Sequence, residues 1–599
     1  MTQHLNLPPH SVLREDRPDG SILLRSGYQM SAPARCTGDW LQAWARDTPG
    51  ATFLAERSGA GWRTETYASA WQKARAIGGW LLGQGLGADD PILVLSGNSI
   101  DHALLSLGAQ LVGVPFVPVA EQYALVEAAE PRLRYVIDLI KPARVFATDG
   151  TAYARALMLA GCPAICSDPG GTNATPLAQL LVHSDAHVDA ALAAITPDTV
   201  AKILLTSGST SDPKGVLTTQ RMMTTNQAQI GDGLPFVRER PPVLVDWLPW
   251  NHVFGGSHNF NLVLANGGAL YIDDGKPLPA LFPRTLENLR QVPGTISFNV
   301  PVGFAQLLTA LRADADLRQT YFQNLDMIFY AGASLPQDTW VGLEELAQHT
   351  LGRLPLITSS WGLTETAPAA LLQHAPAKGA GIVGVPMTGW DVKLIPDSDG
   401  RMDVRVKGDA LFQGYWKNPA KTADAFDSDG FFITGDAMRF VDPADPSKGL
   451  RFDGRLSEDF KLSTGTWVQA ANLRLEMLAV LAPFAADVVI TGAGRDEVGA
   501  LIVPNRAVLE AAGYSTAEIS GALLADDLFQ TIRARLEDAA AGKGSATRVV
   551  RALILADPPS MATGEATAKG NINFPKLLAN RAALVEQLYD DTDPASITL

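Results

Sequence analysis

Short apolar runs that alternate with helical stretches constrain the fold of this chain more than any other feature. The runs at 92–95 and 144–148 have the length of buried strands, and the stretches at 68–84 and 102–112 have the length of helices. Such alternation is typical of strand–helix units around mainly parallel sheets, so we expect an α/β fold. A chain of 599 residues is too long for one hydrophobic core, which predicts at least two lobes.

The composition limits the partners of the protein. The net charge of −15 argues against a general binder of nucleic acid or of anionic membranes. The longest apolar stretch, 103–120, contains Gln110, Pro115 and Pro118, so we expect a buried helix and strand there and no membrane span. The first thirty residues are charged and lack the apolar region of a secretory signal, which predicts a cytoplasmic protein. A homodimer is left open.

The pattern of predicted strands, turns and helices changes twice in the second half of the chain. From about residue 391 strand-like pieces separated by turns predict a small β-rich subdomain. After residue 457 a separate segment has its own strands, at 487–491 and 551–555, and its own helix, at 525–541. We therefore predict a large N-terminal domain, 1–456, made of two α/β subdomains and the β-rich subdomain, and a small mobile C-terminal α+β lobe, 457–599.

The most informative loop is the segment 204–216, LLTSGSTSDPKGV. An apolar run that is interrupted only by Lys202 leads into hydroxyl and glycine residues and one lysine, Lys214. Backbone N–H groups and hydroxyls can cradle phosphate oxygens while the lysine supplies positive charge. The loop departs from the Walker pattern, because Gly215 follows the lysine and no helix start is evident. The alternative is a serine-rich surface turn.

Two further segments carry candidate ligands. In TSSWGLTETAP, at 358–368, Glu365 beside Thr364 offers the oxygen ligands that Mg²⁺ prefers, and Trp361 could stack on a base. The alternative for this segment is a capped helix start. In ITGD, at 433–436, Asp436 is predicted in a tight turn, where its carboxylate could accept from two ribose hydroxyls; a lone Asp in a turn is usually only a turn residue.

The combination of these segments is more specific than any one of them. The loop at 206–215, YAGAS at 330–334, WGLTET at 361–366, TGD at 434–436 and GRLSEDFKLSTG at 454–465 closely resemble, in order and spacing, the core motifs of the adenylate-forming superfamily. That superfamily includes acyl-CoA and aryl-CoA synthetases, peptide-synthetase adenylation domains and luciferases. The resemblance covers roughly 45–580. Within the superfamily, the sequences of LPWNHVFGG and of the C-terminal motifs most resemble those of the bacterial feruloyl-CoA synthases.

The resemblance implies a ligase that joins a carboxylate to ATP, releases pyrophosphate and passes the acyl group from acyl-AMP to coenzyme A. It implies Mg²⁺ as the cofactor, bound by Glu365, and the α-phosphate bound by Thr364. The phosphate cradle would comprise Thr206, Ser207, Gly208, Ser209, Thr210 and Lys214. The adenine would lie against Gly332, Ala333, Ser334 and Trp361, and the ribose hydroxyls against Asp436 and Arg455.

The C-terminal motifs imply further roles. The lobe would rotate about a hinge at Ser457, a position at which the family commonly has Asp or Lys, and the CoA tunnel would involve Lys461, Gly465 and Trp467. The lysine that neutralises the adenylation transition state is expected at Lys569. Its context, Ala-Lys-Gly-Asn-Ile, differs from the usual Gly-Lys-Ile, and Lys576 is the other candidate.

The implied acid pocket combines aromatic walls with polar groups: His252, Phe254, Asn299, Pro301, Val302, Phe304 and Tyr330. Such a pocket suits a phenyl ring with hydroxyl or methoxy groups, which implies ferulate, coumarate or caffeate as the substrate. His252 could instead be a satisfied core histidine. The alternative enzymes are a fatty or other aryl acid:CoA ligase and an enzyme that loads a carrier protein. A third hypothesis, a relative that binds ATP without turnover, is disfavoured because the charged motif residues are all present.

Overall fold

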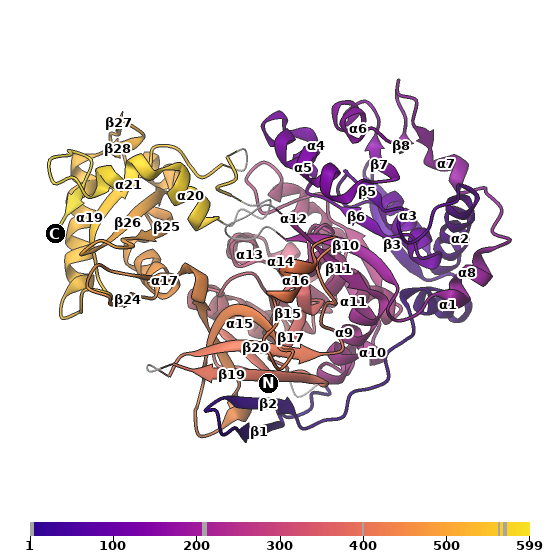
Figure 1. The fold of residues 1–599 in the computed structure, drawn as a ribbon, viewed down its shortest axis with the longest axis horizontal. Helices are drawn as coiled ribbons and strands as arrows, with labels where there is room; N and C mark the ends of the chain where they lie inside the picture. Colours follow the sequence, from indigo (N-terminus) through magenta and orange to yellow (C-terminus); the bar gives the residue numbers. More distant parts are fainter. Residues whose placement is uncertain (1–4, 207–212, 398–399, 561–562, 567–571) are drawn as a thin grey trace.

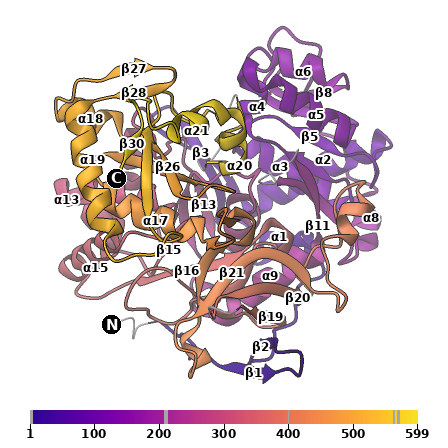
Figure 2. The ribbon, with the colours of Figure 1, turned by 60° about the vertical axis from the view of Figure 1, so that its left-hand side comes forward.

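The protein consists of a large N-terminal domain and a small C-terminal lobe (Figures 1 and 2). The structure is a computed structural model, and it describes residues 5–206, 213–397, 400–560, 563–566 and 572–599. Strands and helices alternate along the chain in both lobes. This confirms the predicted α/β fold class and the small second lobe.

A seven-stranded sheet forms the first α/β subdomain. Its neighbouring strands are parallel, except that β11 runs antiparallel to β10. In sheet order the strands are β11 (Lys214–Thr219), β10 (Val200–Thr206), β6 (Phe116–Pro118), β5 (Ile92–Val94), β7 (Arg144–Asp149), β8 (Ala164–Asp168) and β9 (Thr175–Pro176). The predicted strands at 92–95 and 144–148 are therefore β5 and β7.

Helices cover both faces of this sheet. One face packs on α2 (Tyr67–Gly83) and α3 (Ile100–Leu111), and the other on α4 (Glu121–Leu125), α5 (Glu130–Ile140) and α6 (Ala154–Ala160). The two long helices begin where side-chain oxygens accept backbone N–H groups: Thr66 caps α2 and Ser99 caps α3. The other helices of the large domain's first half are α1 (Thr37–Asp47), α7 (Leu177–Leu180), α8 (Val188–Ala194), α9 (Gln220–Gly233), α10 (Phe236–Glu239) and α11 (Phe260–Ala265).

Two more sheets complete the large domain. The smaller contains β12 (Val243–Asp246), β13 (Ala269–Ile272), β3 (Thr52–Ser58) and β4 (Gly61–Thr66). The larger has eleven strands, in the order β1 (Val12–Asp16), β2 (Ile22–Ser26), β19 (Trp390–Pro396), β20 (Met402–Gly408), β21 (Phe432–Phe440), β22 (Leu450–Arg455), β18 (Ile382–Pro386), β17 (Ala369–Leu372), β16 (Leu356–Gly362), β15 (Met327–Tyr330) and β14 (Ile296–Asn299). The part from β19 to β22 is the predicted β-rich subdomain.

The parallel strands β14, β15 and β16 present opposite faces to two different cores, because side chains alternate along a strand. Phe298 and Phe329 face the central core of the domain, whereas Ile328 and Tyr330 face a separate helical cover. That cover consists of α12 (Phe282–Gln291), α13 (Pro301–Ala313), α14 (Ala315–Phe322) and α15 (Gln337–Leu351).

The C-terminal lobe has its own hydrophobic clusters. Its main sheet, in the order β25 (Ala485–Thr491), β26 (Val498–Pro504), β29 (Val549–Ile554) and β30 (Ile597–Thr598), lies between α17 (Ala470–Leu481) with α19 (Asp526–Ala540) and α20 (Phe574–Asn580) with α21 (Ala582–Leu588). Smaller elements are β23 (Phe460–Lys461), β24 (Trp467–Val468), β27 (Ala517–Ile519), β28 (Ala522–Leu524) and α18 (Arg506–Ala511), with α16 (Pro419–Ala423) in the large domain. Within the described part of the chain, no helix is long and apolar enough to cross a membrane.

Candidate active site

The Ser- and Gly-rich segment lies in sequence between two antiparallel strands, β10 and β11. Thr206, the last residue of β10, pairs directly with Lys214, the first residue of β11, so a strand follows the loop and no helix does. This agrees with the departure from the Walker pattern that the sequence predicts. The predicted phosphate ligands Ser207, Gly208, Ser209 and Thr210 lie outside the described residues.

A tyrosine joins the lysine of this hairpin to the predicted metal ligand. The Lys214 ammonium lies 4.8 Å from the centre of the Tyr415 ring, and the Tyr415 hydroxyl donates to Glu365 Oε1 at 2.9 Å. Burial raises the pKa of the Glu365 carboxyl, while the Tyr415 hydrogen bond and the Lys214 charge act to lower this pKa. Thr364 begins the same 3-10 turn as Glu365, Thr364–Thr366, so the two predicted ligands are adjacent.

Tyr415 is a site residue that the sequence motifs do not mark. Its backbone forms an isolated bridge with Val216, and the next residue, Trp416, donates its N–H to the Gly215 carbonyl at 2.7 Å. The segment 414–416 thus adds to the edge of β11, about two hundred residues away along the chain. Only a prediction of that long-range pairing could have found Tyr415.

The predicted ribose ligands form a second connected group. Asp436 is 2% exposed; its Oδ2 accepts from the Trp361 indole N–H at 2.9 Å, and its Oδ1 lies 3.4 Å from Arg455 Nε. Oδ1 is buried and receives no hydrogen bond from the described residues, so it has the capacity to accept a further donor. Burial raises the pKa of the Asp436 carboxyl, and the Arg455 charge opposes this shift.

The prediction of a tight turn at Asp436 was wrong. The residue lies inside strand β21, directly opposite Arg455 on β22. The register shifts after Asp436, and Gly435 has a φ of +73°, a conformation that glycine adopts readily. The Thr-Gly-Asp sequence therefore produces an irregular strand and not a chain reversal.

The predicted adenine segment follows strand β15. Gly332, Ala333 and Ser334 are exposed, at the carboxyl ends of the parallel strands β14, β15 and β16, where α/β proteins commonly bind ligands. Gly332 has a φ of +88°, which favours glycine at this position. The Tyr330 hydroxyl accepts the Gly381 N–H at 3.2 Å and so fixes the start of the segment.

Part of the predicted acid pocket lies in an aromatic cluster of the central core. Phe254 belongs to a π-helix, Phe254–Asn259, and its ring packs 5.9 Å from Phe298 and from Phe329. His258 of the same π-helix packs 5.3 Å from Phe298 and 5.1 Å from Phe329. Burial lowers the pKa of His258 to about 4, and its Nε2 has no hydrogen-bond partner among the described residues. His252 accepts the Phe254 N–H through Nδ1 at 3.2 Å.

The structure does not bring the whole predicted pocket together. Phe304 is fully buried in the cover formed by α12 to α15, on the opposite face of the sheet from Phe254. Tyr330 faces the same cover, and Val302 is 56% exposed in the first turn of α13, which begins at Pro301. Asn299 ends β14 and accepts the Trp247 indole N–H at 3.1 Å. Phe304 therefore cannot share a wall with Phe254.

The residues predicted to approach CoA share one small hairpin. Lys461 on β23 pairs with Trp467 on β24, the ammonium lies 4.9 Å from the indole ring, and Gly465 has a φ of +80° in the turn between them. Ser457 lies in the 3-10 turn Leu456–Glu458, between β22 of the large domain and this hairpin. Lys569 lies outside the described residues.

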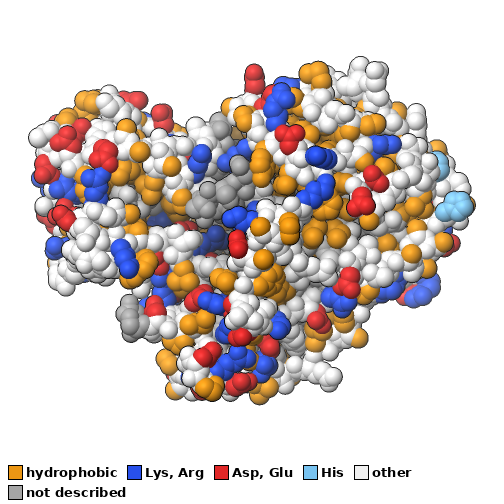
Figure 3. Space-filling model, in the orientation of Figure 1, with side chains coloured by type: hydrophobic (Ala, Val, Ile, Leu, Met, Phe, Trp, Pro, Cys, Tyr) orange, Lys and Arg blue, Asp and Glu red, His pale blue; other side chains and the backbone are white. Residues whose placement is uncertain are grey.

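A buried polar cluster joins the two lobes beside Ser457. Arg401 of the large domain pairs with Asp459 of the C-terminal lobe and donates to the Asp453 carbonyl at 2.8 Å. Asn472 on α17 donates to Asp453 Oδ1 at 2.7 Å. The surface is hollowed where the lobes meet, and Lys and Arg side chains lie in the hollow (Figure 3).

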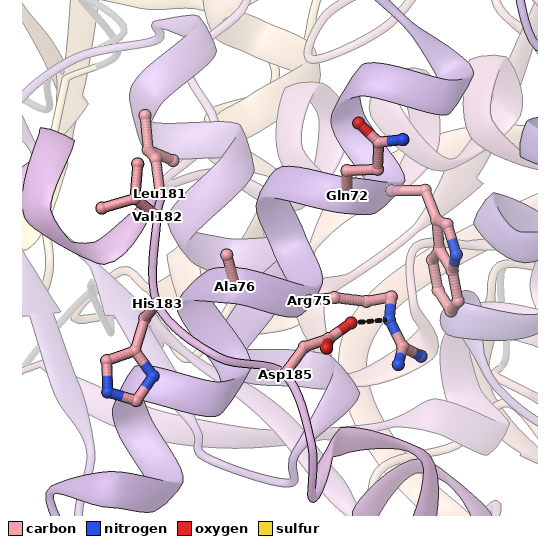
Figure 4. A pocket seen from close by; sticks show the side chains of 8 residues that line it. Gln72, Arg75, Ala76, Leu181, Val182, His183 and Asp185 are labelled. Carbon is pink, nitrogen blue, oxygen red and sulfur yellow. Dashed lines mark hydrogen bonds and ion pairs between the residues drawn. The ribbon is translucent and has the colours of Figure 1, made fainter.

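A separate surface pocket lies away from these groups, between α2 and the segment 181–185 (Figure 4). Its charged groups are already paired, because Arg75 Nε lies 2.6 Å from Asp185 and the guanidinium also pairs with Asp189. None of the predicted site residues lines this pocket, so we assign no ligand to it.

Comparison with known proteins agrees with this geometry. The profile of the AMP-binding enzyme family matches residues 41–416, and that of the AMP-binding enzyme C-terminal domain matches 460–593. The long-chain-fatty-acid–CoA ligase FadD15 of Mycobacterium bovis is 25% identical over 595 residues, which cover 91% of this chain and 95% of that protein. The carboxylic acid reductase of Mycobacterium marinum is 25% identical over 583 residues, which cover 88% of this chain but only 46% of the reductase.

The fold matches solved structures as well. The crystal structure of ATP-bound MatB from Rhodopseudomonas palustris superposes with a TM-score of 0.70 at 20% identity, over 92% of this chain and 99% of that one. The first family profile alone spans more than half of the 599 residues and contains the hairpin loop, Glu365 and Tyr415. The chain belongs to the AMP-binding enzyme family.

Proposed function

We propose that the protein is an ATP-dependent acid:CoA ligase that activates a hydroxycinnamate, such as ferulate, as its acyl-AMP and then transfers the acyl group to CoA. The observation that carries the nucleotide half of this proposal is the line of contacts from Lys214 through Tyr415 to Glu365, next to buried Asp436 with its unfilled Oδ1. The charges of Lys214 and Arg455 both act on the Glu365 carboxyl, although these residues are more than two hundred positions apart in the chain, which supports a shared site.

The chain's own residues have defined tasks in adenylation. Lys214 and Thr206 would hold the outer phosphates, and Asp436 with Arg455 would hold the ribose, so that the acid's carboxylate can attack the α-phosphorus as the bond to pyrophosphate breaks. Lys569 would neutralise charge in that transition state. The site fits Mg²⁺, because Glu365 offers one carboxylate and Mg²⁺ commonly binds one or two carboxylates plus substrate phosphates. When bound, Mg²⁺ would offset the negative charge of the departing pyrophosphate.

Transfer to CoA would use the C-terminal lobe. We propose the boundary between the lobes at Ser457, about which the lobe would turn to bring Lys461, Gly465 and Trp467 to the acyl-AMP. The CoA thiolate would attack the acyl carbon, and AMP would leave. The exposed indole of Trp467, 58% accessible, with Lys461 above it, suits contact with a partly apolar and anionic ligand.

The aromatic cluster of Phe254, His258, Phe298 and Phe329 supports an aryl acid, since rings pack well on rings and a buried imidazole suits a hydroxylated substrate. The similarity of LPWNHVFGG and of the C-terminal motifs to feruloyl-CoA synthases supports the same class. A second candidate substrate class is the long-chain fatty acids, which the relation to FadD15 favours.

Pyrophosphate release tests the proposal. Purified protein with ATP and Mg²⁺ would be assayed with ferulate, coumarate, caffeate, benzoate, octanoate and palmitate, each with and without CoA. We expect CoA-dependent turnover with the hydroxycinnamates. A preference for palmitate would replace the substrate class but keep the ligase reaction, and release with none of the acids would refute the proposed function.

A further inference from the structure

Lys202 is a buried lysine that has no counter-ion among the residues that the structure describes. It lies on β10, four residues before Thr206, and is only 2% exposed. Its ammonium donates to the Gly256 carbonyl at 2.7 Å and lies 5.9 Å from the Phe116 ring. No carboxylate of the described residues lies within ion-pair distance of it. Burial lowers the pKa of Lys202 to about 7.

The acceptor belongs to the π-helix that carries Phe254 and His258. In this helix the Phe260 N–H bonds to the Gly255 carbonyl, five residues back, which leaves the backbone more open than in an α-helix. Gln227 on α9 donates to the next two carbonyls, of Ser257 at 3.4 Å and of His258 at 3.2 Å. Three successive carbonyls of the π-helix are thus held by side chains of two other elements.

Close packing also favours this backbone path. A Cβ added at Gly256 would lie 2.2 Å from the Trp250 carbonyl oxygen, so the π-helix can approach the preceding loop only because the residue is glycine. Glycine adds no stiffness of its own, so the side-chain donors Lys202 and Gln227 add to the backbone hydrogen bonds of the π-helix.

We propose that Lys202 is a positioning residue for acid binding, which together with Gln227 fixes the π-helix wall of the acid pocket; this inference rests on the proposed function. A charge-assisted hydrogen bond in a nonpolar surrounding is strong and directional, so it selects one path of the Gly256 backbone. Without it the turn can relax toward an α-helix, which would rotate Phe254 and His258 relative to Phe298 and Phe329. The residue touches no reacting atom.

The test compares two buried lysines. Lys202→Met keeps the length of the side chain and removes the donor. Lys393→Met is the matched control, because Lys393 is 4% exposed but pairs with Asp427 and Asp429, far from the π-helix along the chain. Gln227→Leu removes the second donor and serves if Lys202→Met does not fold. The readouts are KM for the acid, KM for ATP, kcat of pyrophosphate release, and amide hydrogen exchange of a peptide that covers 252–260.

We expect Lys202→Met to raise KM for the acid at least tenfold, to change KM for ATP less than twofold and to speed exchange in 252–260. Gln227→Leu should act in the same direction with a smaller effect, and Lys393→Met should leave both KM values and kcat unchanged. If exchange in 252–260 is unchanged in both Lys202→Met and Gln227→Leu, the inference is overturned, even if the ligase reaction is established. Equal effects on KM for the acid in both lysine variants would overturn it as well. If the wild-type protein activates none of the acids, but 252–260 still exchanges faster in the variants than in the wild type, the proposed function is refuted while the role of Lys202 at the π-helix is not.

Discussion

Replacing Lys202 with methionine is expected to stabilise the protein at neutral pH, although it should impair acid binding. The pKa of Lys202 falls from 10.5 to about 7 because burial disfavours the ammonium form. At 1.36 kcal/mol for each pH unit, this difference corresponds to about 5 kcal/mol of lost stability when the group is charged. Loss of the hydrogen bond to Gly256 would offset roughly 1 to 3 kcal/mol of the gain. Lys202→Met should therefore be more stable by about 2 to 4 kcal/mol near pH 7.

The sign of the pH dependence follows from the protons bound in each state. Below about pH 7, Lys202 is charged in both the folded and the unfolded protein, and the full penalty is present. Between pH 7 and 10.5 the folded state loses the proton while the unfolded state keeps it, so the stability of the wild type rises with pH. The advantage of Lys202→Met should shrink by about 2 kcal/mol between pH 7 and pH 9, because the slope approaches about 1.4 kcal/mol per pH unit.

Urea unfolding at pH 7, 8 and 9, followed by tryptophan fluorescence, measures this difference. Lys393→Met is the control with the opposite expected sign. It removes one of the two cations that pair with Asp427, while Arg405 stays 3.1 Å away, so a loss of about 1.5 to 3 kcal/mol is expected, the contribution of one hydrogen bond to a charged group. A Lys202→Met protein that is destabilised as much as Lys393→Met would refute the reasoning. A stability difference that does not vary from pH 7 to pH 9 would also refute it, since Lys202 would then have an ordinary pKa.

Three further predictions concern the nucleotide site and the contact between the lobes. Tyr415→Phe removes the hydrogen bond to Glu365, so the rate of pyrophosphate release should fall roughly tenfold, about the effect of one charge-assisted bond. Because that bond lowers the pKa of Glu365 against the effect of burial, the acid limb of the pH–rate profile should move to higher pH. An acid limb that does not move would contradict this role of Tyr415. Asp436→Asn keeps an acceptor for Trp361 but removes the charge beside Arg455, so titration with ATP should show KM raised about tenfold, whereas an unchanged KM would exclude Asp436 from ribose binding. Asp459→Asn removes the carboxylate of the C-terminal lobe that pairs with buried Arg401, which keeps the Asp453 carboxylate 3.5 Å away. The urea midpoint should therefore fall by the equivalent of about 2 kcal/mol, compared with almost no change for the exposed-pair control Asp16→Asn.

Local patterns in the sequence were sufficient for elements that local physics determines. The strands β5 and β7 and the helices α2 and α3 lie within a few residues of their predicted bounds, because each combines a clear apolar period with a cap or a turn. The pairing of the N-terminal strands was not predictable in this way. β2 joins β19 through contacts such as Arg25 with Asp391, 366 residues apart, and neither segment signals its partner.

In the candidate site, too, local motifs predicted some residues, whereas others depend on long-range packing. Motif order predicts one functional group for Lys214, Glu365, Asp436 and Arg455. The structure has two contact groups, Lys214 with Tyr415 and Glu365, and Asp436 with Arg455, and the Arg455 charge acts on the Glu365 carboxyl. The residues of the acid pocket were harder to predict from the sequence, because the face of a strand that points toward a ligand depends on which helices cover the sheet. Phe304 follows β14 closely in sequence, yet α13 carries it to the opposite face from Phe254.

The contrast between the two buried lysines connects stability with function. Lys393 is compensated by Asp427 and Asp429, as a buried charge in a purely structural role should be. Among the described residues, Lys202 contacts the Gly256 carbonyl and the Phe116 ring but pairs with no carboxylate. The lowering of its pKa to about 7 corresponds to a penalty of about 5 kcal/mol, comparable with the 5 to 15 kcal/mol of total stability typical of a domain. A methionine would fill the same space without that penalty. Such a residue is understandable if a charged donor is needed under the π-helix, and stability and acid affinity should then respond to Lys202→Met in opposite directions.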